Sequence, residues 1–592
     1  MSAPREARWG WGEPMREARR GVIGVPDARK GRAAFFGALL ALGAILAAGS
    51  VWAQIPKTLP GAVEPGRDRP LPAPPSPGIF DFSIETPRRS PVPRAVDELR
   101  FQLKDINIVG ATVFTPQELR PLYTDLLGKE VALSDILNVA DAIEAKYRER
   151  GYIISRAYVP PQRVGNGIFT INVVEGYVSG IALEGGDPGV RSLIQAYINP
   201  VLQSKPLVLE PMERGLLLAN DLPGVTAAGL LRPSPDTPGA SDLVVNVTQS
   251  PWTGGINADN RGSKFTDRWT IGGDVEWNSP LGDGDQISAN IQTAPDPDVR
   301  IQGTARYQHP IGTSGLTGSA YVTVSNGAPV GVLSKLSLTT NSVAAGLRLS
   351  YPLMRTRAQS LTLEGGFTWQ DAEVHVGMPV STQISHDHWH VVDAAVSYTQ
   401  TGFWSGNTSA SLDVAQGIPG FGASQNDSPS LSRPGAHTDF TKITATIKRA
   451  QVIWGPVNVA ITAQGQHAFE PLLVGEQISF GGAQIGRGYD PAALTGDDGI
   501  GGSAELRYDT RIDQYFIQTV EPYAFYDTAK IWNRRGGNGS GLALHSTGAG
   551  VRVGLDHNIS TGVEFAHTLT AVPGSDNGTK RYKVLFNAAV RF

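Results

Sequence analysis

The spacing of hydrophobic residues divides the chain into a region of mixed periods and a longer region of alternation. Between Leu99 and Thr248, segments with apolar residues three and four positions apart are interleaved with short alternating segments. From Trp252 onward, alternating segments prevail, separated by turns rich in Gly, Asn, Asp and Pro. A period near 3.6 predicts helix and a period of two predicts strand. The pattern therefore predicts α+β modules followed by an all-β region.

Residues 98–176 are predicted to form the first module, with the element order β-α-α-β-β. A helix over 133–150 precedes two strands, near 153–159 and 168–175. One face of this helix carries Ile136, Val139, Ala140, Ile143 and Tyr147 at helical spacing. Residues 177–249 repeat the same order, which predicts a second module of the same kind. Small sheets with free edges can accept a strand from a partner, so we expect docking modules rather than an enzyme.

Residues 250–592 are predicted to form a transmembrane barrel. Alternating segments of about ten residues separated by turns are typical of such barrels, and the length allows about 16 strands. In lipid, only closed barrels pair the backbone groups of every strand. In the last segment, Tyr582, Phe586 and Phe592 share one parity, whereas Lys583 has the other. One face therefore suits lipid, and we expect this C-terminal strand to serve membrane insertion.

The N-terminus has the pattern of an export signal. Eight Lys/Arg precede an uncharged stretch over 33–53, which ends in an A-x-A-like cleavage site before Gln54. Residues 1–53 are therefore predicted to be a signal peptide, with a single membrane anchor as the alternative. Residues 54–97 are predicted to be a linker, because their eleven prolines disfavour helix and strand pairing and favour polyproline II.

Composition supports an exported β protein and excludes several classes. The 592 residues include no Cys, which excludes disulfide frameworks, cysteine–zinc sites, iron–sulfur ligation and thiol catalysis. Charged residues make up 18%, whereas about 25% is typical of soluble domains. A net charge of −4 argues against a nucleic-acid partner. No G-x-S-x-G, H-E-x-x-H or G-K-[ST] motif occurs. The sequence predicts neither an enzyme nor a cofactor.

Two groups of residues could in principle bind a metal, but neither is predicted to do so. His386, His388 and His390 share one face of a predicted strand, where metal binding is conceivable. The residues that follow with the same parity are apolar, so we place these histidines at the membrane rim. The carboxylates between Asp283 and Asp298 are interpreted as turn residues. No metal site is predicted.

Four segments, in chain order, carry a resemblance to a known family. They read GYIISRAYVPPQRVGNGIFTINVVEG over 151–176, RGLLLANDLPGVTA over 214–227, DNRGSKFTDRW…NSPLGDGDQIS over 259–288, and FGGAQIGRGYDP over 480–491. They resemble the ShlB/FhaC/HecB family, the outer-membrane transporters of two-partner secretion, whose barrels carry POTRA domains. Asp267 stands where this family is expected to have Gly. The resemblance covers nearly all the chain after the signal peptide and implies two POTRA-like modules in the periplasm.

The fourth segment contains the tip of a long loop that folds back into the barrel in this superfamily. The tip residues, which resemble an R-G-[YF] motif, are Arg487, Gly488 and Tyr489. The resemblance implies that Arg487 pairs with the aspartate of an F-x-D-x-G strand motif, matched here by Phe525 and Asp527, with Ala529 in place of Gly. An arginine inside a lumen needs a carboxylate, because an unpaired buried charge is costly. We expect a gating pair; two separate solvated residues are the alternative.

The resemblance implies a transporter that secretes one large partner protein. We expect the partner to dock on the first module by strand addition and through apolar side chains beside helix 133–150: Ile136, Val139, Ile143, Tyr152 and Ile154. Outer-membrane lipid and the machinery that assembles barrels are further expected partners. A barrel-assembly factor of the same superfamily and a nutrient porin are the alternatives. The passenger itself, whether adhesin, haemolysin or haem-acquisition protein, is left open.

Overall fold

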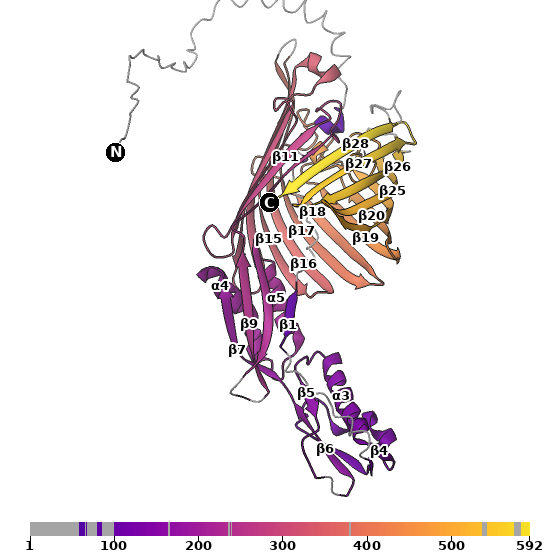
Figure 1. Ribbon diagram of the computed structural model, residues 1–592. Helices are drawn as coiled ribbons and strands as arrows, with labels where there is room; N and C mark the ends of the chain where they lie inside the picture. The colour runs from indigo at the N-terminus through magenta and orange to yellow at the C-terminus, as the bar shows by residue number, and fades with distance from the viewer. Residues whose placement is uncertain are drawn as a thin grey trace, which may run out of the picture. The chain divides into compact units, whose positions relative to one another are not determined.

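The computed structural model places a closed barrel and two smaller α+β modules in the residues that it describes (Figure 1). These residues are 59–65, 67, 80–85, 100–163, 166–234, 237, 239–377, 381–534, 541–572 and 582–592. The predicted signal peptide, 1–53, lies outside them. All described residues from Pro60 onward belong to one compact unit.

The first module packs one long helix on a three-stranded sheet. Its elements are β2 (Arg100–Gln102), β3 (Asp105–Val109), α2 (Pro116–Leu119), β4 (Glu130–Ala132), α3 (Leu133–Glu149), β5 (Arg156–Tyr158) and β6 (Ile168–Val174). The sheet order is β3-β6-β5, and β2 pairs with β4. Thr115 caps α2 in a capping box with Glu118, as the sequence of this turn favours. The order β-α-α-β-β is therefore present, with the first helix much shorter than the second.

The second module has the same order of elements. They are β7 (Tyr177–Gly185), α4 (Pro188–Ile198), α5 (Leu209–Asn220), β8 (Val225–Pro233) and β9 (Ala240–Gln249). Both helices bury one apolar face in a core that includes Ile194, Met212 and Leu216, each 0% exposed. No helix among the described residues is long and apolar enough to span a bilayer.

The Pro-rich linker contains a strand, which corrects the expectation that its prolines prevent pairing. Strand β1 (Asp81–Ile84) pairs in parallel with β8 and completes a sheet of order β1-β8-β9-β7. The stretch from Gly78 to Thr86 contains no proline, so its N–H groups remain available. Phe80, Phe82 and Ile84 alternate along it and pack on the module core. This short period-two pattern was the overlooked signal.

The barrel wall contains 16 antiparallel strands in the described part of the chain, which confirms the predicted fold class. The wall segments are β10 (Trp252–Asp259), β11 (Thr270–Asn278), β12 (Gln286–Thr293), β13 (Arg300–Ile311), β14 (Leu316–Gly327), β15 (Leu338–Arg355), β16 (Gln359–Val376), β17 (Thr382–Phe403), β18 (Gly406–Gly417), β19 (Thr441–Trp454), β20 (Val457–Ala468), β23 (Asp498–Tyr508), β24 (Thr510–Gln514), β25 (Ile517–Trp532), β26 (Leu542–Leu555), β27 (Ile559–Thr568) and β28 (Tyr582–Arg591). Segments β23 and β24 both pair with β25 and form one wall strand. Pairing of β28 with β10 closes the barrel.

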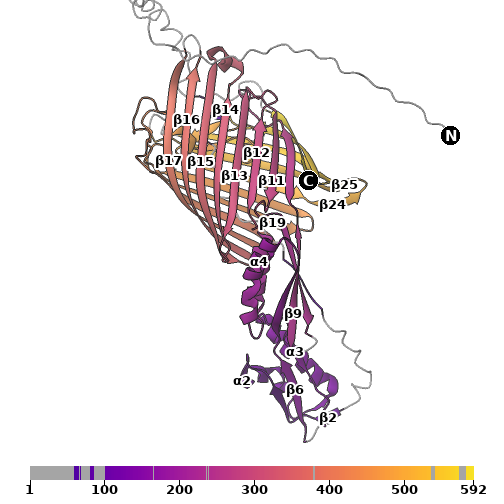
Figure 2. The same cartoon turned by 90° about the vertical axis from the view of Figure 1, so that its left-hand side faces the viewer.

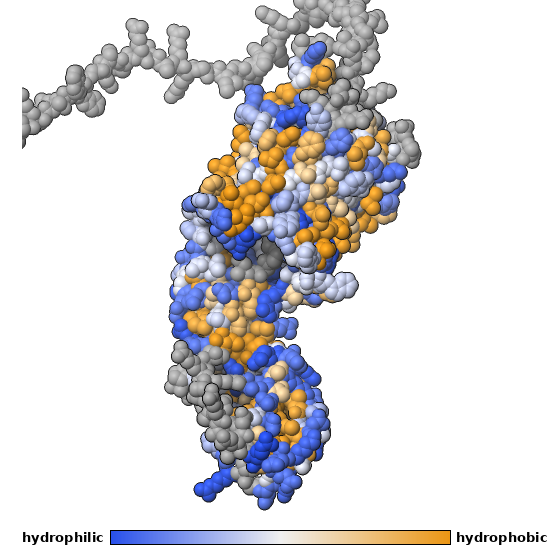
Figure 3. Space-filling model, turned by 45° about the vertical axis from the view of Figure 1, so that its right-hand side comes forward, coloured by the Kyte–Doolittle hydropathy of each residue, from blue (hydrophilic) through white to orange (hydrophobic). Residues whose placement is uncertain are grey.

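Apolar side chains face outward from the barrel, and polar ones face inward. Figure 2 shows the strands from β11 to β17 side by side in one wall, and Figure 3 shows hydrophobic residues gathered in large patches on the outer surface. On the last strand, Tyr582, Phe586 and Phe592 are 61%, 43% and 72% exposed. Their outward position agrees with the predicted lipid face.

Short turns connect the strands at one end, and longer loops connect them at the other, as is typical of outer-membrane barrels. The second module contacts the end with the short turns. Arg357 N, in the turn after β15, donates to Glu213 Oε1 at 2.6 Å. Arg214 donates to the carbonyl oxygen of Pro352 at 3.0 Å. Helix α5 is thus held directly against the barrel rim.

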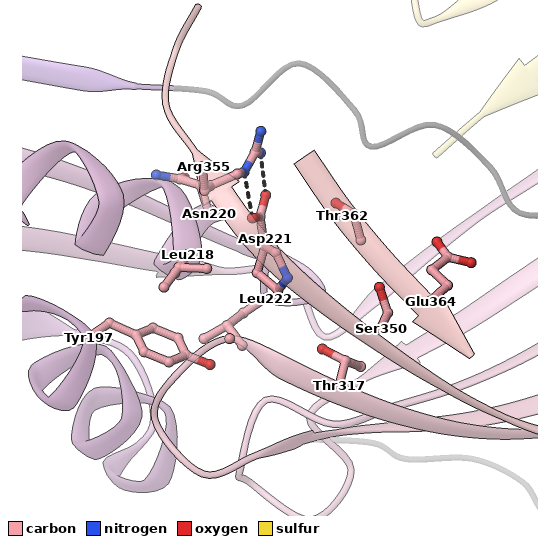
Figure 4. Close-up of a pocket in the computed structure, with 12 residues that line it drawn as sticks. Tyr197, Leu218, Asn220, Asp221, Leu222, Thr317, Ser350, Arg355, Thr362 and Glu364 are labelled. Atoms are coloured by element: carbon pink, nitrogen blue, oxygen red, sulfur yellow. Dashed lines mark hydrogen bonds and ion pairs between the residues drawn. The ribbon is translucent and has the colours of Figure 1, made fainter. Parts of the chain in front are cut away.

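A cavity of about 360 Å³ lies where this module meets the barrel (Figure 4). Leu218 and Leu222 of the module line one side, and lumen-facing Thr317 and Glu364 line the other. Asp221 accepts two hydrogen bonds from Arg355, at 2.8 Å to Nε and 2.5 Å to Nη2. This two-point pair joins the module to the end of β15.

Candidate functional site

The loop over residues 469–497, between β20 and β23, enters the barrel and brings its tip against the wall. It contains η9 (Val474–Glu476) and a hairpin of β21 (Ile478–Phe480) and β22 (Leu494–Gly496). The chain turns sharply at Gly481 and Gly486, whose φ angles of +114° and +90° strain other residues. The tip residues that follow are buried.

Arg487 and Asp527 form a buried two-point ion pair at the loop tip. Arg487 Nη2 donates to Asp527 Oδ1 at 2.9 Å and Nε donates to Oδ2 at 3.1 Å. The backbone N–H groups of Gly486 and Arg487 also donate to Oδ2, at 3.1 and 2.9 Å. Asp527 is 0% exposed and Arg487 is 5% exposed. The two residues expected to pair therefore meet, 40 positions apart in the sequence.

Two further carboxylates hold Arg487, and sequence reasoning missed both. Glu505 Oε2 on β23 lies 2.6 Å from Nη1, and Glu564 Oε2 on β27 lies 3.6 Å from it. Both side chains are at most 6% exposed. Glu564 interrupts a run of small residues on the lumenal parity of β27, and Glu505 shares the lumenal parity of β23 with Arg507. A charge in a barrel strand has to face the lumen, so this pattern was a usable signal.

A ring of arginines balances these carboxylates. Arg507 Nε and Arg552 Nη1 donate to Glu505 Oε1 at 2.6 and 2.8 Å. Arg261, just after β10, donates to Glu564 at 3.1 Å. The network thus spans strands β23 to β27 and reaches β10, where the barrel closes. Removing one cation would leave buried negative charge without compensation.

The other residues of the two motifs fix the loop tip by close packing. The Arg487 guanidinium lies 3.5 Å from the ring centroid of Phe525, a cation–π contact. Tyr489 Oη donates to main-chain carbonyl oxygen and lies 2.8 Å from His545 O and 2.7 Å from Thr570 O. A Cβ on Gly488 would lie 2.8 Å from Thr568 Cγ2, so any larger residue would have to displace the neighbouring strand's side chain. The tip is therefore held by shape as well as charge.

Asp490, the residue after this motif, connects the tip to both strands at the barrel closure. It forms ion pairs with Lys583 on β28 and with Arg268 in the connection from β10 to β11. Lys583 has the parity opposite to that of the outward-facing aromatic residues of the last strand. Lys583 and Asp490 are 93 positions apart in the sequence, so only the folded barrel brings them into contact.

The side chains expected to contact a partner beside helix 133–150 pack in or against the module cores. Ile136, Val139 and Ile143 are at most 3% exposed and pack on the first module's sheet. Ile154 packs in the core of the second module, and Tyr152 packs against the first. Helical periodicity identified an apolar face, but the module's own sheet covers it. A partner cannot contact the buried members Ile136, Val139, Ile143 and Ile154 directly in this conformation, whereas Tyr152 is only partly buried.

Strand β5 lies at an edge of the first sheet, and Glu144 satisfies its outward donor. Within the described residues β5 pairs with β6 alone. Ala157 N donates to Glu144 Oε1 at 3.2 Å, and Arg156 lies 3.5 Å from Glu144. Tyr158 is 47% exposed beside them. This edge is therefore short and is protected by one side chain from α3.

Glu175, at the end of the first resemblance segment, is a structural carboxylate. It accepts hydrogen bonds from Tyr147 Oη at 2.6 Å and from Val113 N at 2.9 Å, and it also accepts from Thr112. Burial tends to raise the pKa of Glu175, but these hydrogen bonds outweigh it and hold the pKa below its usual range. Glu175 therefore links both ends of the module as a carboxylate.

The three histidines are paired within the protein. His386 and His388 lie 2.8 and 3.0 Å from Asp371 Oδ2, and Trp369 Nε1 donates to His388 Nε2 at 3.2 Å. His390 lies 3.2 Å from the carbonyl oxygen of Phe421. No group of three or more metal-ligating side chains with metal-binding geometry occurs in the described ranges.

Comparison with known protein families gives two matches. The profile described as haemolysin secretion/activation protein ShlB/FhaC/HecB matches residues 239–553, and the ShlB-type POTRA domain matches residues 101–176. Hemolysin transporter protein HpmB of Proteus mirabilis is 26% identical over 439 residues, covering 72% of this chain and 76% of HpmB. Heme/hemopexin transporter protein HuxB of Haemophilus influenzae is 22% identical over 522 residues, covering 84% of this chain and 88% of HuxB.

Solved structures share the fold at low identity. CdiB from Escherichia coli superposes with a TM-score of 0.65 at 21% identity, over 86% of this chain and 93% of CdiB. CdiB from Acinetobacter baumannii gives a TM-score of 0.58 at 16% identity, over 94% and 98%. Both likenesses extend over the modules and the barrel together.

Proposed function

Because this chain belongs to the ShlB/FhaC/HecB family of haemolysin secretion/activation proteins, we propose specific roles for its loop tip and its first module in secretion. The chain is an outer-membrane transporter that secretes a partner exoprotein by the two-partner route. Its N-terminal modules lie in the periplasm and its barrel lies in the outer membrane. The main support for these roles is the loop tip. Buried ion pairs hold it inside the lumen, so it needs a trigger to move.

The proposed gate is the cluster of Arg487 with Asp527, Glu505 and Glu564. In the closed state, the tip occupies the lumen and blocks an unfolded chain. An incoming passenger displaces the tip, and the exposed guanidinium and carboxylates gain water as they separate. Hydration offsets part of the lost Coulomb attraction, so the pair holds the resting state without making release prohibitive.

The proposed docking site is the edge of β5, not the buried face of α3. A passenger strand that pairs with β5 would replace Glu144 as the acceptor for Ala157 N–H. The side chain of Tyr158 would then pack on the added strand. Residues Ile136, Val139, Ile143, Tyr152 and Ile154 contribute indirectly, because they hold α3, the sheet and the neighbouring module in place.

The proposed passenger is a large exoprotein of the kind that the relatives handle. HpmB and ShlB are hemolysin transporters, and HuxB is a heme/hemopexin transporter. Lipid would contact the outward face of the barrel. The machinery that assembles barrels would recognise the last strand, where Tyr582, Phe586 and Phe592 point outward.

Deletion of the gene tests the function. We expect one large exoprotein to disappear from the medium or cell surface, while other outer-membrane proteins stay unchanged. Depletion of many barrels with an unchanged exoprotein profile would instead indicate an assembly factor.

Substitution at the β5 edge tests docking. Ala157→Pro removes the outward N–H and should weaken binding of that exoprotein to the full-length transporter. The matched control, Ala157→Gly, changes the same position but keeps the outward backbone donor and should retain most binding. Equal binding by both variants and the wild type would contradict strand addition at β5.

A further inference from the structure

The loop over 469–497 has a second set of buried ion pairs at its base, with partners that do not pair with the tip. Glu476 precedes the β21–β22 hairpin and Asp497 follows it. The two carboxylates are 2% and 0% exposed. The ion pairs of the tip come from β23, β25 and β27, whereas those of the base come from β19 and the connection over 418–440. Arg534 N, just after β25, also donates to Asp497 at 2.8 Å. The ion pairs at the two ends of the loop therefore share no residue.

Glu476 binds three wall strands. Lys442 on β19 lies 2.7 Å from Glu476 Oε2 and also donates to the main-chain oxygen of Glu476 at 2.7 Å. Trp389 Nε1 on β17 and Gln370 Nε2 on β16 donate to Glu476 Oε1 at 2.9 and 3.1 Å. Each partner is itself at most 5% exposed. The loop base is thus joined to the wall by one fully coordinated carboxylate.

Asp497 binds the neighbouring connection, residues 418–440, at the end of the barrel away from the modules. Arg433 in that connection makes a two-point ion pair with Asp497, with Nη2 2.8 Å from Oδ2. Arg433 Nη1 also donates to the carbonyl oxygen of Leu472 at 3.1 Å. His437 N donates to Pro471 O at 2.9 Å, and His437 forms a β-bridge with Leu472.

An apolar cluster closes over these charges. It combines wall residues, the connection over 418–440 and the loop base: Ala372, Trp389, Val391, Ala415, Leu431, Ala436, Phe440, Ala468, Leu472 and Leu473. Every member is at most 4% exposed. The loop base is therefore held to the wall and to the connection over 418–440 by packed side chains as well as by charge.

We propose that Arg433–Asp497 and Lys442–Glu476 form a second lock, which closes the outer mouth of the pore and opens separately from the Arg487 tip. This inference rests on the proposed secretion function. Release of the tip alone leaves residues 472–477 joined to the wall and to the connection over 418–440. The passenger therefore needs both ends of the loop to be displaced. Ion pairs suit this role because water can solvate their separated charges, whereas a wholly apolar seal offers no such compensation.

Channel conductance tests the second lock without any passenger. Purified full-length Glu476→Gln/Asp497→Asn keeps the size of both side chains but removes both charges. The change is made on an Arg487→Ala background, in which the tip is already released. In planar bilayers the open fraction should rise by about tenfold or more over that of Arg487→Ala alone, because Lys442 and Arg433 lose their buried counterions. The control, Arg511→Ala on the same background, removes an ion pair whose side chains are 80% and 61% exposed and should match Arg487→Ala. An open fraction equal to that of Arg487→Ala alone would overturn the proposal.

A disulfide trap tests whether the base moves during secretion. The natural chain contains no cysteine, and bridge partners on adjacent strands lie about 4.8 Å apart, within reach of a disulfide. Cells with His437→Cys/Leu472→Cys should stop secreting the exoprotein when oxidised and resume when reduced, whereas either single variant should secrete throughout. Secretion at the wild-type level by fully oxidised protein would show that the passenger leaves while the loop base stays closed, and would overturn the second lock. Failure of the wild type to secrete any exoprotein would instead refute the proposed function, and the conductance measurement would still test the lock on its own.

Discussion

The modules and the barrel use the same residue types in opposite places. In the modules, Ile136 and Ile143 are fully buried. On the barrel wall, Ile461 and Ile500 are 51% and 58% exposed. The hydrophobic effect drives apolar groups away from water in both regions. Water surrounds the modules, whereas lipid surrounds the barrel wall, and so the same force produces opposite arrangements.

Buried charges also have different roles in the modules and in the barrel. In the first module, Glu144 and Glu175 satisfy backbone N–H groups and stabilise the module. In the barrel, buried charges face the pore and bind the loop that we propose moves during secretion, as Arg487 and Asp527 do. Buried charges of the first kind are part of the fold, whereas those of the second kind separate in the proposed mechanism. Four predictions test this contrast, from the largest expected effect to the smallest.

The largest effect is expected at the loop tip. Arg487→Ala leaves Asp527, Glu505 and Glu564 without their shared cation, at a cost of about 3–5 kcal/mol to the closed loop. That cost shifts the ratio of closed to open loop by more than about a hundredfold. The barrel should still insert, but its loop no longer returns to the closed position from which the passenger displaces it, so secretion should fall sharply. Exoprotein in the medium and the amount of inserted barrel are the two measurements.

Arg487→Lys is the matched control for this variant. It keeps the charge but loses the planar two-point contact, so an intermediate secretion level is expected. Normal secretion by both Arg487→Ala and Asp527→Ala would remove the tip from the gating mechanism.

The second prediction compares isoleucine in the two regions. Ile143→Ala should destabilise the first module by about 2–5 kcal/mol, because it loses buried apolar surface and leaves a cavity. Ile461→Ala on the barrel should cost about 1 kcal/mol, because lipid chains fill the space and half the side chain is exposed. Hydrogen exchange in the module and chemical unfolding of the barrel measure the two losses. Equal costs would mean that the wall position is packed like a core.

The third prediction concerns Glu175, whose pKa is lowered in the folded module. Glu175→Gln should destabilise the first module by about 1.5–3 kcal/mol at neutral pH, because hydrogen bonds to a charged acceptor become neutral ones. A carboxylate with a lowered pKa stabilises the fold above its unfolded pKa and loses that contribution as pH falls through the folded pKa. The wild-type module should therefore weaken in acid more than the variant does. Hydrogen exchange across this pH range is the measurement, and parallel curves would assign no role to the charge.

The smallest effect is expected at the exposed pair of Arg511 and Asp513, 3.2 Å apart. Solvent screens this pair, so Asp513→Asn should change barrel stability by less than about 1 kcal/mol. Unfolding in denaturant, compared with Asp527→Asn, checks this ranking. A loss as large as that of Asp527→Asn would contradict the link between burial and effect.

Local pattern was sufficient for most of the fold because its physical causes are local. Helix α3 follows from its apolar period, α2 begins where the Thr115–Glu118 capping box does, and each barrel strand alternates because lipid and lumen lie on opposite faces. The strand β1 was missed because proline density was weighed over the whole linker rather than over the proline-free stretch that pairs.

The sequence by itself determined the order of the elements, the parity of each strand and the two motifs that meet at Arg487 and Asp527. Only the tertiary structure decided the remaining partners. Glu505 and Glu564 reach Arg487 from strands that the curved wall brings opposite the loop tip. Asp490 meets Lys583 because the first and last strands close the barrel beside it. The alternation of side chains along a strand reflects only whether each residue faces lipid or lumen. Contacts across the lumen depend on how the 16 strands close into a barrel, and no local pattern encodes that closure.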